Sequence, residues 1–148
     1  MKIHFTLNGQ PVELEAEPFA RLAPILADVL GIASVRTPCG IGRCGACMVL
    51  LDGRPVNACL VVAGKVEGAE ILTAEGVADA AKPVIDALER HGAVQCGYCA
   101  PGLLVSLAAA HRGTGDMKAE DVEGLLTGNL CRCSGYAGLR KAIADVFA

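Results

Sequence analysis

The chain has 148 residues, of which 13 are basic and 16 acidic, and its formal net charge is −3. This balance argues against a nucleic-acid partner, because nucleic-acid-binding domains usually carry a clearly basic face. Apolar residues make up 53% of the chain and the mean hydropathy is +0.45, which excludes intrinsic disorder. Yet no apolar run approaches the roughly 18 residues that span a bilayer, so we expect no membrane span.

The first part of the chain predicts a hairpin followed by a helix. Residues 2–8 alternate apolar and polar side chains, and the Asn8-Gly9 pair predicts a tight turn into a return strand over 11–17. Apolar residues at helical spacing predict a helix over 21–30. The N-terminal segment lacks the apolar block of a signal peptide, so we expect a cytoplasmic protein.

A second hairpin and a closing strand complete the predicted sheet. Residues 48–51 and 56–62 flank an Asp52-Gly53 turn, and 70–73 reads as one more strand. Two hairpins around one helix predict a small mixed sheet that folds over the helix.

The rest of the chain predicts helices throughout. Apolar residues recur at helical spacing over 77–91, 102–111 and 137–147, and Pro83 is expected to open the regular part of the first of these helices. A further short helix, capped by Asp116, runs to about Leu126. Four short helices with brief connections are typical of a compact bundle.

The change in pattern divides the chain into two small domains. The joint falls within residues 64–82, and we place the domains at 1–75 and 76–148, which makes the fold class α+β. Each half would be marginally stable alone, because domains this short bury too little surface. A metal centre in each half would supply the missing stability.

Eight cysteines in a protein expected to stay in the cytoplasm indicate metal or redox chemistry, since disulfides are rare there. The first four form a C-x4-C-x2-C run with one distant cysteine, the ligand spacing of a plant-type 2Fe–2S cluster. The glycines between them adopt positive φ readily and leave amide N–H groups open to the cluster. Structural zinc is the alternative, although its usual form is two separated pairs. The four residues are Cys39, Cys44, Cys47 and Cys59, the last on the predicted return strand.

The second group consists of a C-x2-C pair, Cys96 and Cys99, and a C-x-C pair, Cys131 and Cys133. Both pairs lie in loops at helix ends, which can present them to one site. Nearby helix N-termini would favour an anionic cluster there. By spacing alone this group could hold zinc or a second iron–sulfur cluster.

With these motifs in place, the sequence resembles the small iron–sulfur subunit of the molybdenum hydroxylases, the xanthine oxidase class. The matching segments are 37–47, 94–102 and 126–136, in the same order and over nearly the whole chain. The C-x2-C with C-x-C combination is highly specific to that family. Ala100 and Ser134 stand where threonine is commoner, and we expect neither to touch a cluster ligand.

The resemblance implies an N-terminal β-grasp, plant-type ferredoxin-like domain and a C-terminal four-helix bundle domain, each with one 2Fe–2S cluster. It also implies that the second cluster lies next to a molybdopterin cofactor held mainly by a separate large subunit. The residues that would contact this cofactor are Gln95 and Cys133. Without the resemblance, Gln95 would be read as an ordinary loop amide.

The function that follows is electron relay in an oxidoreductase complex, with the substrate chemistry in the partner and no catalytic residue in this chain. Electrons would pass singly from the molybdopterin centre through both clusters to a flavin-binding (FAD) or cytochrome (haem) subunit. The alternatives are a freestanding two-cluster ferredoxin and a zinc-stabilised interaction module. Export of the folded complex with a partner would place it in the periplasm instead.

Overall fold

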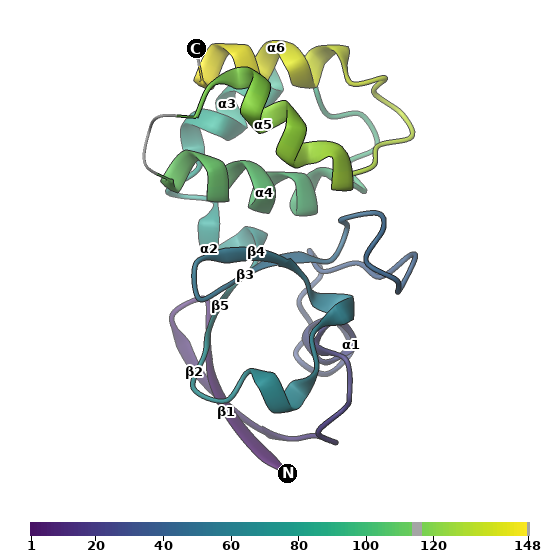
Figure 1. The fold of residues 1–148 in the computed structure, drawn as a ribbon, viewed down its shortest axis with the longest axis vertical. Coiled ribbons are helices and arrows are strands. Elements are labelled where there is room, and N and C mark those ends of the chain that lie inside the picture. The colour runs from purple at the N-terminus through teal and green to yellow at the C-terminus, as the bar shows by residue number, and fades with distance from the viewer. Residues whose placement is uncertain (114–116, 148) are drawn as a thin grey trace.

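The computed structural model describes residues 1–113 and 117–147. Within them, a five-stranded mixed sheet lies on one side of the molecule and a layer of helices on the other (Figure 1). The strand order is β2-β1-β5-β3-β4, with β1 and β5 parallel and the other neighbours antiparallel. The strands are β1 (Lys2–Leu7), β2 (Gln10–Glu15), β3 (Met48–Leu51), β4 (Arg54–Asn57) and β5 (Glu70–Leu72).

Both predicted hairpins form. Lys2 pairs with Glu15 at one end of the first hairpin and Leu7 with Gln10 at the turn. The predicted alternation in β1 is confirmed: Ile3 and Phe5 are buried on the inner face of the sheet, while His4 points outward.

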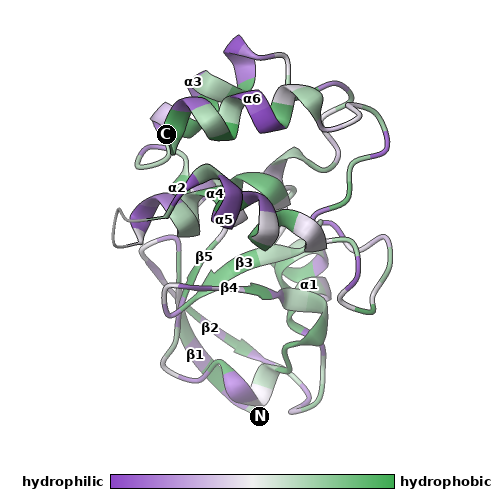
Figure 2. Ribbon diagram, turned by 45° about the horizontal axis from the view of Figure 1, so that its top comes forward, coloured by the Kyte–Doolittle hydropathy of each residue, from purple (hydrophilic) through white to green (hydrophobic). Residues whose placement is uncertain are grey.

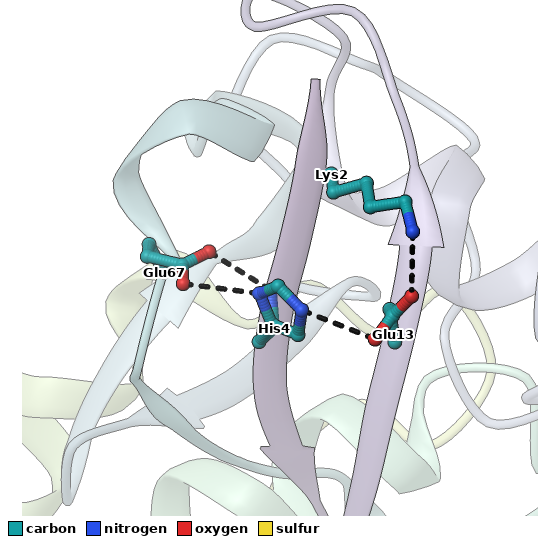
Figure 3. A network of polar contacts seen from close by, with 4 residues as sticks. All are labelled: Lys2, His4, Glu13 and Glu67. Atoms are coloured by element: carbon teal, nitrogen blue, oxygen red, sulfur yellow. Dashed lines mark hydrogen bonds and ion pairs between the residues drawn. The ribbon is translucent and has the colours of Figure 1, made fainter.

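The outer face of β1 carries an exposed polar network (Figure 3). The two ring nitrogens of His4 lie 3.2 Å from a Glu67 carboxylate oxygen and 3.1 Å from one of Glu13, and Lys2 lies 3.3 Å from the same Glu13 carboxylate. The network joins β1 to β2 and to the turn before β5. Solvent screens these exposed charges, so they contribute little to stability.

The second hairpin is shorter than predicted. The return strand β4 ends at Asn57 and is followed by a 3₁₀ turn over Ala58–Leu60, so the expectation that Cys59 lies on a strand is wrong. Ala58 and Cys59 are buried in the core of the sheet half, and the turn contacts the helix at Leu22–Pro24. The predicted first helix is likewise irregular: α1 (Leu22–Pro24) passes into a π-helical turn over Ile25–Val29.

The regular part of the helix predicted over 77–91 is α3 (Lys82–Arg90), and Pro83 lies in its first turn as predicted. The start of the predicted range instead ends a separate short helix, α2 (Ala74–Val77). Proline lacks an N–H and clashes with the preceding turn in a helix interior, so it fits where a new helix begins.

The remaining helices follow the predicted pattern more closely. In α5 the Asp121 carboxylate accepts a hydrogen bond from Lys118 N–H just before the helix, whereas Asp116, the predicted cap, lies outside the described residues. A short 3₁₀ segment extends α5 over Leu126–Gly128. The helices are α4 (Ala100–Arg112), α5 (Ala119–Leu125) and α6 (Ala137–Val146).

Two hydrophobic cores meet at α4. One lies between the sheet and α1, and the other lies among α2 to α6. Leu50 of β3 belongs to the helical core, which shows that the sheet packs directly on the helices. Figure 2 shows hydrophobic residues along α4, where it lies over β3 and β4. No helix within the described ranges is long and apolar enough to cross a membrane.

Candidate metal centres

The first four cysteines are brought together by the register of the second hairpin. Met48 pairs with Asn57, so Cys47 and Cys59 lie just beyond the paired ends of β3 and β4. Cys59 N–H donates to Cys47 Sγ at 3.4 Å, and both residues are buried. Cys39 and Cys44 lie in the loop before β3, where their side chains are in hydrogen-bonding contact. The four cysteines thus form two contacting pairs, and Cys44 lies close enough to Cys47 to influence its thiol electrostatically.

The backbone of this loop is shaped by glycine. Gly42 has φ +72°, and its N–H donates to Cys59 Sγ at 3.2 Å. A Cβ at Gly42 would lie 2.4 Å from Cδ1 of Leu60. The positive φ of Gly42, which residues with a Cβ rarely adopt, lets the loop point this amide at the sulfur.

The thiols of the first group differ widely in acidity. Backbone N–H groups of Ile41, Cys44 and Arg43 lower the pKa of Cys39 to about 6. Burial raises the pKa of Cys47 to about 12, so its thiolate is costly without a compensating positive charge. A metal centre supplies that charge, and its binding releases the protons of such thiols.

The second group assembles between helix ends. Cys99 immediately precedes α4, and Cys131 and Cys133 lie in the loop between the 3₁₀ segment after α5 and α6. Cys96 Sγ and Cys133 Sγ are 3.5 Å apart, and Cys99 contacts Cys131. Burial raises the pKa of Cys99 to about 11.

Cys131 is surrounded by hydrogen-bond donors. Burial acts to raise its pKa, but the Ser134 hydroxyl, Ser134 N–H and Cys133 N–H outweigh it and lower the pKa to about 7. Ser134 Oγ lies 3.2 Å from Cys131 Sγ. The expectation that Ser134 touches no candidate ligand is therefore wrong, because the loop folds back on itself after Cys133.

The two groups touch through the main chain. Leu130 N–H donates to the carbonyl oxygen of Cys44 at 2.9 Å, and Leu130 directly precedes Cys131. Beside this bond, Asn129 is buried, accepts from the Ser106 hydroxyl at 2.9 Å and donates to Gly45 O at 3.4 Å. One hydrogen bond thus joins a cysteine of the first group to the neighbour of a cysteine of the second.

A second bridge between the two halves is Arg36. Its guanidinium donates to the carbonyl oxygens of Gly97 at 2.9 Å and Tyr98 at 2.6 Å, and lies 4.9 Å from the centre of the Tyr98 ring. The loop that carries Cys96 and Cys99 is therefore held against the first half. The sequence offered no signal for Arg36 or Asn129, since their partners are more than 60 residues away or belong to another element.

Replacing Arg36 with methionine should lower the free energy of unfolding by about 1–2 kcal/mol, because two charge-assisted hydrogen bonds and a cation–π contact are lost. Chemical denaturation of the metal-loaded chain measures this. Arg54→Met on the exposed edge of β4 is the matched control and should change stability little. Equal stability of the two variants would contradict the role of Arg36.

Main-chain donors point at candidate ligand sulfurs in both groups. Within residues 1–113 and 117–147, no group of three or more His, Cys, Asp or Glu side chains is placed to hold a single metal ion. The amides directed at sulfur, 3.2 Å for Gly42 and 3.4 Å for Ser134, suit an anionic cluster.

Exposure differs between the two groups. Cys47 and Cys59 are buried, whereas Cys96 and Cys133 are exposed. Gln95, next to Cys96, is also exposed. The second group therefore has one exposed pair, Cys96 and Cys133, and one half-buried pair, Cys99 and Cys131, and all eight cysteines are free of disulfides.

Comparison with known proteins identifies close relatives. A family model for a 2Fe-2S binding domain matches residues 73–144. The chain is 40% identical over 147 residues to the xanthine dehydrogenase iron-sulfur-binding subunit of Escherichia coli O157:H7, covering 97% of this chain and 92% of that one. It is 38% identical over 143 residues to the nicotinate dehydrogenase small FeS subunit of Eubacterium barkeri, covering 95% and 91%. The solved aldehyde oxidoreductase of Desulfovibrio desulfuricans superposes with a TM-score of 0.90 at 37% identity, over 99% of this chain and 17% of that chain.

Proposed function

The chain belongs to the small iron–sulfur subunits of the molybdenum hydroxylases, whose role is electron transfer within an oxidoreductase, and on this premise we propose how its residues perform that role. We propose that it carries single electrons from a molybdopterin centre in a large partner subunit to a flavin-binding or cytochrome subunit. The observation that carries the proposal is the pair of four-cysteine groups joined by the bond from Leu130 N–H to Cys44 O.

We propose that two domains carry out this electron transfer. Residues 1–75 form one, with the β-grasp arrangement of a plant-type ferredoxin, and residues 76–148 form the other, a four-helix bundle. The separate hydrophobic cores support this division, and α2 (Ala74–Val77) begins where the proposed boundary lies. The Desulfovibrio enzyme, of which this chain covers 17%, supports a larger partner that in this protein would be a separate polypeptide.

Each proposed ligand set holds one 2Fe–2S cluster, which takes up and releases one electron at a time. All eight ligands would be thiolates, and potentials as high as those of His-ligated clusters are therefore not expected. The protein tunes each centre through burial and through hydrogen bonds to sulfur. The ligands proposed for the two sets are Cys39, Cys44, Cys47 and Cys59, and Cys96, Cys99, Cys131 and Cys133.

The exposure of the second set supports its place next to the molybdopterin. Cys96 and Cys133 are exposed and so is Gln95, which leaves these groups free to meet a partner's cofactor. We propose that Gln95 hydrogen-bonds to molybdopterin and that Cys133 both binds the cluster and approaches the pterin. The first set then lies farther along the route, and its buried Cys47 and Cys59 shield that centre from solvent.

The experiment that tests this proposal is the metal content of the native complex, purified from its own host with a tag on this chain. We expect about four iron atoms per chain, together with molybdenum and a co-purifying large polypeptide. Flavin or haem in the same sample would identify the acceptor. Iron without molybdenum or a partner would favour a freestanding two-cluster ferredoxin, and zinc in place of iron would contradict both functions.

A further inference from the structure

The loop after Cys131 closes a ring of hydrogen bonds around one candidate ligand. Cys131 N–H donates to the Tyr136 hydroxyl oxygen at 2.8 Å. Tyr136 N–H donates to Ser134 Oγ at 3.3 Å, and Ser134 Oγ lies 3.2 Å from Cys131 Sγ. Ser134 N–H lies 3.4 Å from the same sulfur. All three side chains are half-buried, which limits competition from water.

The ring determines the direction of the serine hydroxyl. Because Ser134 Oγ accepts the N–H of Tyr136, its single hydrogen is left to donate to Cys131 Sγ. A thiolate can only accept, so this direction is the one that persists when Cys131 is deprotonated to bind iron. The sulfur of Cys131 then receives one side-chain donor and one main-chain donor.

The backbone of the loop is held in an uncommon conformation that maintains this ring. Tyr136 has φ +67°, in the left-handed region that residues with a Cβ rarely adopt. A strained backbone conformation of this kind persists only where surrounding contacts hold it in place, and such conformations are enriched at functional sites. Here the contacts are the bonds that join both the N–H and the hydroxyl of Tyr136 to the loop.

We propose that the Ser134 hydroxyl is a positioning residue that raises the reduction potential of the cluster held by Cys131. The proposal rests on the proposed function, since it requires a cluster at this group. A cluster that gains one electron becomes more negative, and a hydrogen-bond donor to a ligand sulfur stabilises the reduced state more than the oxidised one. No bond is broken in the step, and the proton stays on the serine oxygen.

The first group provides an internal reference. The donors to its sulfurs in the structure include Gly42 N–H and Cys59 N–H, which belong to the main chain and are unaffected by substitution of Ser134. The two clusters are thus present in one molecule, and only the second has the serine hydroxyl at its ligand. A change in the reduction potential of the second cluster alone would therefore reflect the lost hydroxyl and not general damage to the protein.

The test is a redox titration of the native complex, with the reduced clusters followed by electron paramagnetic resonance. The matched variants are Ser134→Thr and Ser134→Val, which have nearly the same shape but differ in the hydroxyl group, and Ser134→Ala completes the series. We expect Ser134→Val and Ser134→Ala to lower the midpoint potential of one cluster and Ser134→Thr to keep it near the wild-type value. The other potential should stay constant, and the iron content should remain at about four atoms per chain in each variant. A Cys131→Ser variant identifies which signal belongs to the second cluster, because that signal is lost or altered in it.

Three results would overturn the proposal: unchanged potentials in Ser134→Val, equal shifts in Ser134→Thr and Ser134→Val, or equal shifts of both clusters. If Ser134→Ala and Ser134→Val lose part of their iron, the hydrogen bond is tested by comparing protein in H₂O with protein exchanged into D₂O. The magnetic coupling between an exchangeable proton and the reduced second cluster should be weaker in the Ser134→Ala molecules that retain iron than in the wild type. An unchanged coupling would contradict the hydrogen bond. Failure of the proposed function is distinct: the purified wild-type complex would then lack molybdenum and a large partner, or would hold zinc and show no iron–sulfur signal.

Discussion

A chain in which serine replaces Cys47 should hold about two iron atoms instead of about four, and one of the two iron–sulfur signals should disappear. Cys47 is 2% exposed, and burial raises the pKa of its thiol to about 12. An alcohol is a much weaker acid than a thiol and a poorer ligand for iron, so a buried serine would stay protonated and leave the first centre one ligand short.

Iron analysis and electron paramagnetic resonance of the reduced complex measure this loss. Cys99→Ser is the reciprocal control, because Cys99 is also partly buried and belongs to the second group. It should remove the signal that Cys47→Ser retains. Retention of about four iron atoms and both signals in Cys47→Ser would show that Cys47 is not a ligand.

Replacing Gly102 with alanine should destabilise the chain by about 2–3 kcal/mol, because the added methyl group overpacks the contact between the two halves. A Cβ at Gly102 would lie 2.1 Å from the carbonyl oxygen of Gly45 and 3.1 Å from Cα of Ala46. Both are backbone atoms of the first cysteine loop. They can move only if that loop moves away from α4, which would also strain the bond from Leu130 N–H to Cys44 O.

Denaturant unfolding of the metal-loaded chain, with iron content measured alongside, tests this prediction. Gly124→Ala in α5 is the matched control, because a Cβ there meets nothing within 4 Å. The control should be unchanged or more stable by up to about 1 kcal/mol, since alanine favours a helix over glycine. If Gly102→Ala were as stable as Gly124→Ala, the close packing of α4 on the first loop would be contradicted.

Features that depend on neighbouring residues were predictable from the chain alone. The β1–β2 hairpin follows from alternating side chains around Asn8-Gly9, and the turn is confirmed, with Leu7 paired to Gln10 beside it. The spacing of the cysteines, with glycines among them, indicated which four belong together in each half. Those groups do converge in the structure, while the assignment of each cysteine as an iron ligand stays a prediction for the substitutions above to test.

Features that depend on packing were not predictable in this way. The apolar run after Asn57 is typical of a strand, yet Cys59 lies in a 3₁₀ turn that is buried in the core and contacts α1. The start of α3 at Pro83 was predictable, whereas the separate short helix α2 before it was not. Ser134 looked like a minor substitution until the fold placed its hydroxyl 3.2 Å from Cys131 Sγ.

The chain alone was therefore enough to identify the two cysteine groups and the order of sheet before helices, because spacing and periodicity act over a few residues. The family came from the resemblance of whole segments. How the two groups meet depends on the fold, which places Leu130 against Cys44, Gly102 against Gly45 and Arg36 against Tyr98. Each of these contacts joins residues more than 50 positions apart. Their geometry is set by the packing of α4 on β3 and β4, and no local pattern encodes it.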